Sequence, residues 1–218
     1  MTFLIRYGYQ FFIGAMVTLV SWLIAGILSL SIGLILGIVS SKYFATPFVA
    51  KLVRGYTFVA KGVPAYVQIL IAYFVLPSIL GINISGFFAA NFALAFCSSG
   101  YATEIVRTGI NTIPVGQWEA CSVLGYPLIA ALKRIILPQT FRNILPALFG
   151  ELEQLLKSTS LLAAIGVTEL TRTGMNIISR ELNPLPVYLT VACIYLLISG
   201  VLQLIMIWRE GGLKYDRS

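Results

Sequence analysis

The sequence contains no histidine, and only 11% of its 218 residues are charged. Without histidine, the chain lacks the commonest general base and the commonest metal ligand in proteins. It also lacks a GxxxxGK[ST] phosphate-binding loop, which excludes a nucleotide-hydrolysing domain of that type. Soluble domains carry about 25% charged residues, so the low charge content indicates a chain that lies largely in lipid. We expect a non-catalytic membrane protein.

The three cysteines, Cys97, Cys121 and Cys193, are widely separated and form no CxxC pair. Such spacing supports neither a metal site nor a redox motif, and small packing residues are the simpler interpretation. The net charge of +7 does not indicate a nucleic-acid partner, because no basic run alternates with aromatic residues. The positive charges instead lie between apolar segments, where they bear on membrane topology.

Five apolar segments are long enough to approach the roughly 20 residues that a membrane-spanning helix needs. They are 11–39, 63–80, 87–106, 144–165 and 187–208. The sequence therefore predicts an all-α polytopic membrane protein, with residues 1–218 forming a single domain. In the first span, Gly33 and Gly37 form a GxxxG pattern that favours close approach of another helix, although chance occurrences are common.

Basic residues between the spans predict the orientation, because cytoplasmic loops are rich in lysine and arginine. We expect a loop over residues 40–62, and it and the segment 107–142 both carry several basic residues, whereas 77–86 carries no charge. This pattern places the N-terminus outside and the C-terminus in the cytoplasm. Arg6 precedes the first span and argues the other way, but the remaining loops outweigh it.

A polar segment between the third and fourth spans, Glu119 to Pro138, reads EACSVLGYPLIAALKRIILP. Gly125 can adopt a positive φ, and Pro127 suits the start of a new helix, so we predict two short helices that meet at Gly125. An ordinary interhelical loop has no need of such a hinge. The segment is therefore interpreted as a docking element, within a loop of about 112–140.

The same segment resembles the signature loop of the membrane subunits of bacterial ATP-binding-cassette importers. That signature is Glu-Ala-Ala, three residues, Gly, nine residues and Ile-x-Leu-Pro, and the chain matches it at Glu119, Ala120, Gly125, Ile135, Leu137 and Pro138, with Cys121 replacing the last Ala. Other motifs are similar to the polar amino acid permease branch, including Gly14, Thr18 and Leu19, Tyr101, Glu104 and Arg107, and Lys157, Thr159 and Ser160. The chain departs from it at Lys61, Val63, Gly150 and Ser158.

The resemblance implies a type I importer membrane domain with a cytoplasmic coupling-helix hairpin in the bacterial inner membrane. Two ATPase subunits, which would hold ATP and Mg²⁺, are expected to bind this hairpin, whereas this chain would bind no cofactor. A second permease subunit, identical or similar, and an extracytoplasmic solute-binding protein complete the implied complex. The expected ATPase contacts are Trp118, Glu119, Ala120, Leu124 and Gly125.

The fourth span carries polar residues in two groups. Glu153 and Lys157 have the spacing and order of an intrahelical ion pair. Glu151, Gln154 and Ser158 share a different face and could line a cavity. A carboxylate there would favour a basic amino acid such as arginine. Alternatively, Glu151 pairs with another helix or faces the cytoplasmic vestibule.

In the third span, Ser98, Ser99 and Tyr101 could bind the head group of an amino acid, or could instead make hydrogen bonds between helices. Glu104 is expected to pair with Arg107. Gln68, in the second span, could lie across a dimer or along the pathway.

A different class of function remains open: an ATP-independent secondary carrier or channel that uses the glutamates near mid-membrane for ion coupling. Such carriers usually contain paired repeats and interrupted helices, neither of which is evident in this sequence. The preferred interpretation is a translocation subunit for polar amino acids, with basic ones favoured.

Overall fold

Within residues 2–215, which the computed structural model describes, the chain is helical and forms no β-strand. The α-helices are α1 (Thr2–Val39), α2 (Pro47–Gly62), α3 (Ala65–Leu70), α4 (Leu76–Leu80), α5 (Gly86–Asn111), α6 (Val115–Val123), α7 (Leu128–Ala131), α8 (Leu137–Ser158), α9 (Leu170–Glu181) and α10 (Pro184–Tyr215). Two π-helical stretches, η1 (Ile71–Val75) and η2 (Leu132–Ile136), and one 3-10 stretch, η3 (Thr159–Ile165), connect some of them.

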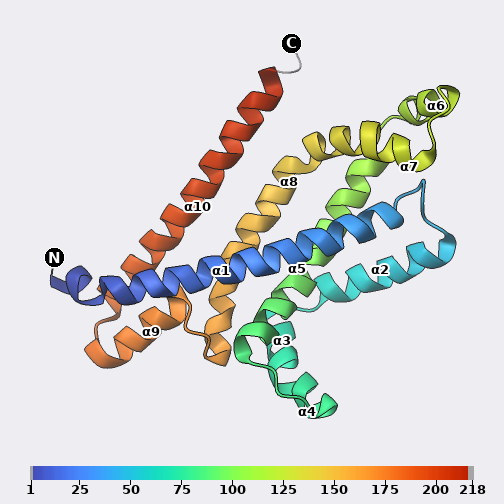
Figure 1. Ribbon diagram of the computed structural model, residues 1–218. Helices are drawn as coiled ribbons and strands as arrows, with labels where there is room; N and C mark the ends of the chain where they lie inside the picture. The colour runs from blue at the N-terminus through green and yellow to red at the C-terminus, as the bar shows by residue number, and fades with distance from the viewer. Residues whose placement is uncertain (1, 216–218) are drawn as a thin grey trace.

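The long helix α1 crosses α5, and α5 also packs against α8 and α2 (Figure 1). The α6–α7 hairpin lies at one end of α5 and α8, whereas α4 and α9 lie toward the opposite end. Helix α10 stands to one side and contacts α8 and α9. The α6–α7 hairpin, which contains the predicted docking segment, therefore lies at one end of the helix core.

The GxxxG pattern of α1 is a packing site, as its spacing predicts. A Cβ on Gly33 would lie 2.4 Å from the Cβ of Ala102, and a Cβ on Gly37 would lie 2.6 Å from the Cβ of Val106. Both contacts are to α5, whose backbone atoms also lie within about 3 Å of these positions. Only glycine leaves room for this approach.

Two prolines follow the π-helical stretches: Pro77 comes after η1 and Pro138 after η2. A proline in a helix lacks its amide N–H and its ring clashes with the carbonyl four residues earlier. The residues four positions earlier, Tyr73 and Arg134, lie within the π stretches, where the backbone is wider. The second helix of the hairpin can therefore continue through Pro138 into α8.

The prediction of a loop over residues 40–62 is wrong for residues 47–62, which form α2. Thr46 caps this helix through a 3.3 Å bond from the backbone N–H of Val49, and Pro47 occupies its first turn. Buried Val53, Thr57 and Ala60 form one face. The charged residues lie outside this face, so the helix is amphipathic. Their charges lowered the mean hydropathy of the segment, which is why the sequence indicated a loop.

Helix α2 and the following helix meet at an angle of 98°, so the chain does contain an interrupted helix. Gln68 stabilises the break: its Nε2 donates 2.8 Å bonds to the carbonyl oxygens of Ala60 and Val63. These bonds satisfy carbonyl oxygens at the end of α2, where the regular backbone hydrogen bonds of the helix stop. Gln68 thus has a partner within its own chain, an arrangement that the sequence did not predict.

Helices occur at all five predicted spans. By length and apolar composition, 5–39 and 184–209 qualify as spans, and the bent pair 47–62 and 65–80 would add a third. Helices α5 and α8 contain 26 and 22 residues. At about 1.5 Å per residue they are long enough for a hydrocarbon core of about 30 Å, although they carry more polar residues. The count of five remains a prediction.

Candidate functional site

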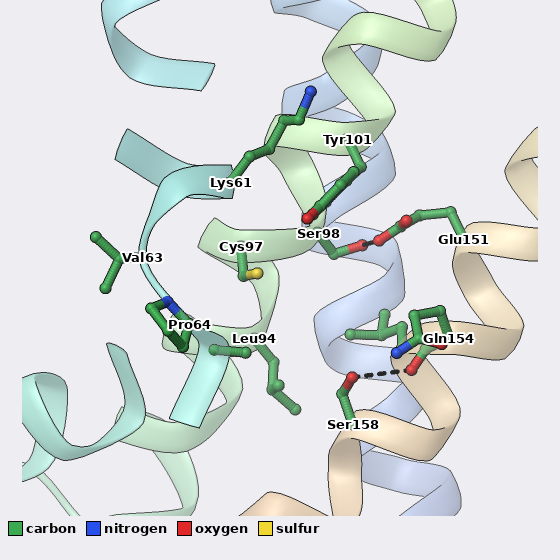
Figure 2. A pocket seen from close by; sticks show the side chains of 12 residues that line it. Lys61, Val63, Pro64, Leu94, Cys97, Ser98, Tyr101, Glu151, Gln154 and Ser158 are labelled. Carbon is green, nitrogen blue, oxygen red and sulfur yellow. Dashed lines mark hydrogen bonds between the residues drawn. The ribbon is translucent and has the colours of Figure 1, made fainter. Parts of the chain in front are cut away.

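A cavity of about 340 Å³ lies between α5, α8 and the α2–α3 bend; we call it the central cavity. Its polar lining includes Ser98 and Tyr101 from α5 and Glu151, Gln154 and Ser158 from α8. These are five of the six residues that the sequence assigned to a substrate pathway. The structure therefore brings residues from two predicted spans to one place (Figure 2).

The carboxylate of Glu151 faces α5 in the central cavity. The hydroxyl of Ser98 donates a 2.7 Å hydrogen bond to Oε1 of Glu151 (Figure 2). Ser98 is buried and Glu151 is half-buried. One alternative from the sequence was that Glu151 has a partner on another helix, and Ser98 of α5 is such a partner. Because the Ser98 hydroxyl is neutral, this contact does not compensate the negative charge of the carboxylate.

Gln154 and Ser158 lie on the same face of α8, one and two turns beyond Glu151. The Ser158 hydroxyl donates a 2.9 Å bond to the carbonyl oxygen of Gln154. Figure 2 shows the Gln154 amide group directed toward the cavity. The face thus combines a carboxylate, an amide and a hydroxyl, which can accept or donate hydrogen bonds to a polar guest.

Ser99 does not reach the central cavity, contrary to the predicted grouping. It is fully buried, donates a 2.7 Å bond to the carbonyl of Phe96, and hydrogen-bonds the hydroxyl of Tyr56 on α2. Adjacent residues of a helix point about 100° apart, so Ser98 faces α8 while Ser99 faces α2. Ser99 fits the interhelical alternative.

Lys61 was missed as a lining residue, because the sequence placed it in a cytoplasmic loop. It lies in the last turn of α2 at the cavity wall, with its ammonium 5.3 Å from the centre of the Tyr101 ring. Lys61 also forms an ion pair with Glu104. The predicted pair between Glu104 and Arg107 is confirmed, with 3.8 Å between Oε1 and Nη2. Glu104 therefore lies between two cations.

The second polar group of α8 forms the predicted ion pair, with 2.7 Å between Lys157 Nζ and Glu153 Oε1. Gln203 of α10 approaches the same carboxylate at 3.4 Å. Neither Glu153 nor Lys157 lines the central cavity. This pair is a separate feature of the helix.

The α6–α7 hairpin, which we call the docking hairpin after its predicted role, has the predicted helix, turn and helix. Helix α6 ends at Val123, Gly125 adopts a φ of +73°, and α7 begins after Pro127. The Tyr126 N–H donates to the carbonyl of Cys121 at 2.9 Å, which closes the turn. Glycine suits this position because other residues rarely adopt positive φ.

Four of the five predicted ATPase contacts, Glu119, Ala120, Leu124 and Gly125, are exposed on the hairpin. Leu124 is 72% exposed. Apolar side chains that the sequence analysis did not single out join them, namely Val123, Leu128 and Ile129. An exposed apolar tip of this kind is typical of a docking surface.

Trp118 lies inside rather than on this surface. It is 7% exposed and stacks on Tyr43, with 3.9 Å between ring centroids, while Phe44 meets it edge to face. Tyr43 and Phe44 belong to the connection between α1 and α2. Trp118 therefore attaches the base of the hairpin to the helix core, a role that differs from the predicted contact.

Glu169 caps α9 at the end of the molecule far from the docking hairpin. Its buried carboxylate accepts bonds from the backbone N–H groups of Thr171 and Arg172, at 2.8 and 2.7 Å, and from the Tyr195 hydroxyl at 3.0 Å. Burial raises the pKa of Glu169 above its usual value, and these donors oppose that shift. The cluster joins α9 to α10.

Comparison with known proteins gives a consistent result. Residues 29–210 match the family model described as "binding-protein-dependent transport system inner membrane component". A putative glutamine transport system permease of Rickettsia typhi is 36% identical over 186 residues, which covers 85% of this chain and 84% of the relative. The arginine transport system permease ArtQ of Bacillus subtilis is 35% identical over 192 residues and covers 88% and 87%.

Solved structures show the same similarity. An amino acid ABC transporter crystallised with histidines superposes with a TM-score of 0.85 at 32% identity, over 95% of both chains. The methionine transporter MetNI in an inward-facing conformation gives a TM-score of 0.81 at 19% identity, over 95% of this chain and 97% of the other. The second match bears on the fold alone.

Proposed function

The chain belongs to the family of binding-protein-dependent transport system inner membrane components, and we propose that, as the permease of an amino acid importer, it favours amino acids with a cationic side chain. Family membership makes it a multi-pass inner-membrane subunit of an ATP-binding-cassette importer that works with ATPase partners. The choice of substrate rests on the central cavity.

The placement of Glu151 carries the proposal. Its carboxylate lies in the cavity beside the neutral hydroxyl of Ser98, while Lys61, a cation that lines the same cavity, is engaged by Glu104. A half-buried carboxylate attracts a positive charge more strongly than one in water, because the local dielectric constant is lower. A guanidinium or ammonium group in the cavity would supply that charge.

The neutral groups of the cavity would bind the rest of the substrate. Gln154, Ser158 and Tyr101 offer hydrogen bonds that suit an amino acid head group. Relatives are named for glutamine and for arginine, and the similar crystal structure contains histidines. These names fit a polar amino acid, and the carboxylate is our reason to favour a basic one.

The complex that we propose contains two copies of this chain or this chain with a similar one, two ATPases and an extracytoplasmic solute-binding protein. Each ATPase binds the exposed tip of a hairpin through Leu124 and its neighbours and holds the ATP and Mg²⁺. The N-terminus lies outside and the C-terminus in the cytoplasm. Nucleotide-driven movement of the hairpins shifts the helices between inward-open and outward-open arrangements, a bistable change that the loaded binding protein also biases.

An ATP-independent carrier would use Glu151 and Glu153 for ion coupling. The α2–α3 break is a feature that such carriers share. However, the family match and the relatives provide no support for that alternative. Amino acid uptake by this chain without any ATPase would indicate such a carrier.

Cys97 provides a direct test, because it lines the central cavity whereas Cys121 is buried. In a Cys193→Ser background, a positively charged thiol reagent should label Cys97 of the assembled transporter. We expect arginine to slow this labelling, and glutamate to have little effect. Labelling that persists in a Cys97→Ser variant sets the background. Equal labelling with and without arginine would contradict the proposed substrate site.

A further inference from the structure

A second cavity, of about 400 Å³, lies between α5 and α8 on the side of the docking hairpin. Glu104 and Thr108 line it from α5, Thr112 lines it from the cap at the end of that helix, and Asn143 lines it from α8. Seven residues of helix, about 10 Å, separate Tyr101 in the central cavity from Thr108 in the second. The two cavities therefore follow one another along the same pair of helices.

One ion pair has a partner in each cavity. Lys61 lines the central cavity, Glu104 lines the second, and the two side chains contact each other. Both are partly exposed, at 29% and 36% of the side chain. A solute that moved from one cavity to the other along α5 would have to pass this pair.

Helix packing fixes the position of the pair. Ala60 and Lys61 lie against Gly100: a Cβ there would be 2.8 Å from the Cβ of Ala60 and 3.2 Å from Cγ of Lys61. Lys61 is also in the last turn of α2, where the helix dipole favours a cation. The pair bridges α2 and α5 next to the 98° bend, so relative movement of these helices would change it.

The chemistry of an amino acid matches this pair. A zwitterion carries one carboxylate and one ammonium, and can therefore replace both partners without leaving either charge unpaired. That matters because an unpaired charge in a region of low dielectric constant is costly, whereas an exchange of partners is not. A neutral or singly charged solute of the same size has no such route.

We propose that the Lys61–Glu104 ion pair is the cytoplasmic gate of the central cavity, and that a zwitterionic amino acid passes it by exchanging its carboxylate and ammonium for the two partners. This inference rests on the proposed function. Tyr101, whose ring contacts the Lys61 ammonium, completes the barrier. The second cavity then receives the released amino acid.

A purely structural role is the competing explanation, because the pair also joins α2 to α5. The contact of Tyr56 with Ser99 and the close packing at Gly100 already join these helices. A gate differs in one measurable respect from an ion pair that only joins two helices: loss of a gate makes the closed transporter leak. The test therefore measures leak rather than stability.

The experiment uses the full complex in vesicles that are preloaded with labelled arginine and contain no ATP. Lys61→Met and Glu104→Gln should each raise efflux about tenfold, which corresponds to a barrier lower by about 1.4 kcal/mol. Lys61→Arg, which keeps the cation opposite Glu104, should leave efflux near the wild-type rate. Glu153→Gln, which breaks the ion pair with Lys157 away from both cavities, is the matched control and should not leak.

Cys97 gives a second readout that does not depend on transport. In inside-out vesicles, Lys61→Met should speed labelling of Cys97 by a membrane-impermeant thiol reagent about tenfold. The gate would be overturned if the single variants showed neither faster efflux nor faster labelling of Cys97 than the wild type. It would also be overturned if the Glu153→Gln control leaked as much as the single variants. If the wild-type complex failed to accumulate amino acids while Lys61→Met still sped labelling, the proposed function would fail but the barrier would stand.

Discussion

Trp118 stacks on Tyr43 with 3.9 Å between the ring centroids, and this contact joins the base of the docking hairpin to the connection between α1 and α2. The indole is 7% exposed, whereas Leu124, farther along the same hairpin, is 72% exposed. The hairpin thus has a buried root and an exposed tip. The two residues should respond differently to substitution.

Trp118→Ala should lower the free energy of unfolding by about 3–5 kcal/mol, because it removes a large buried side chain and leaves a cavity. Leu124→Ala should change stability by less than about 0.5 kcal/mol but weaken capture of the ATPase. Thermal unfolding in detergent and co-purification with the ATPase measure the two effects. An unstable Leu124→Ala variant, or a fully stable Trp118→Ala variant, would contradict this division.

Gly125→Asp should leave the protein folded and inserted but uncouple ATP hydrolysis from uptake. No atom lies within 4 Å of a Cβ at this position, and the positive φ costs an aspartate only about 1–2 kcal/mol. A charge at the apolar tip would oppose docking. ATP hydrolysis and uptake are measured together in vesicles, and undiminished transport by this variant would defeat the assignment of the hairpin.

Gly33→Ala should destabilise the protein by about 1–3 kcal/mol, since its Cβ would collide with Ala102 and with the backbone of α5. Gly8→Ala in the same helix is the control, because no atom lies within 4 Å of that position. Melting temperatures of the two variants in one detergent provide the comparison. Equal melting temperatures would show that α1 and α5 are not closely packed.

The features that could be predicted from the sequence are those that depend on neighbouring residues. Helical periodicity identified the face of α8 that carries Glu151, Gln154 and Ser158, and the requirement for positive φ identified the turn at Gly125. Both signals are local. The burial of Trp118 depends on Tyr43, which is distant in the sequence, and no local pattern reports it.

The bend after α2 shows a second limit of sequence reasoning. Charged residues on one face of α2 made residues 40–62 resemble a loop, although Val53, Thr57 and Ala60 form a buried face. Lys61 was therefore missed at the cavity. Similarly, Ser98 and Ser99 are neighbours on a helix that is packed on two sides, and only the packing shows which of them faces α8.

Glu169→Gln should change how stability depends on pH. Burial raises the folded-state pKa of Glu169, so its stabilising contribution is full below the usual value of 4.5 and is lost as pH rises through the folded-state pKa. Glutamine has no charge to bury. The melting temperature of the variant should therefore rise relative to the wild type as pH increases above 4.5, and a difference that does not vary with pH would contradict this account.

Substrate choice tests the central claim most directly, through the ratio of arginine to glutamine uptake by the reconstituted complex. Glu151→Gln keeps an oxygen that can accept the Ser98 hydrogen bond but removes the charge. We predict that this ratio falls about tenfold, which corresponds to about 1.4 kcal/mol of lost attraction, while Glu153→Gln leaves it unchanged. An unchanged ratio in Glu151→Gln, or an equal loss for both amino acids, would contradict a cation-selective cavity.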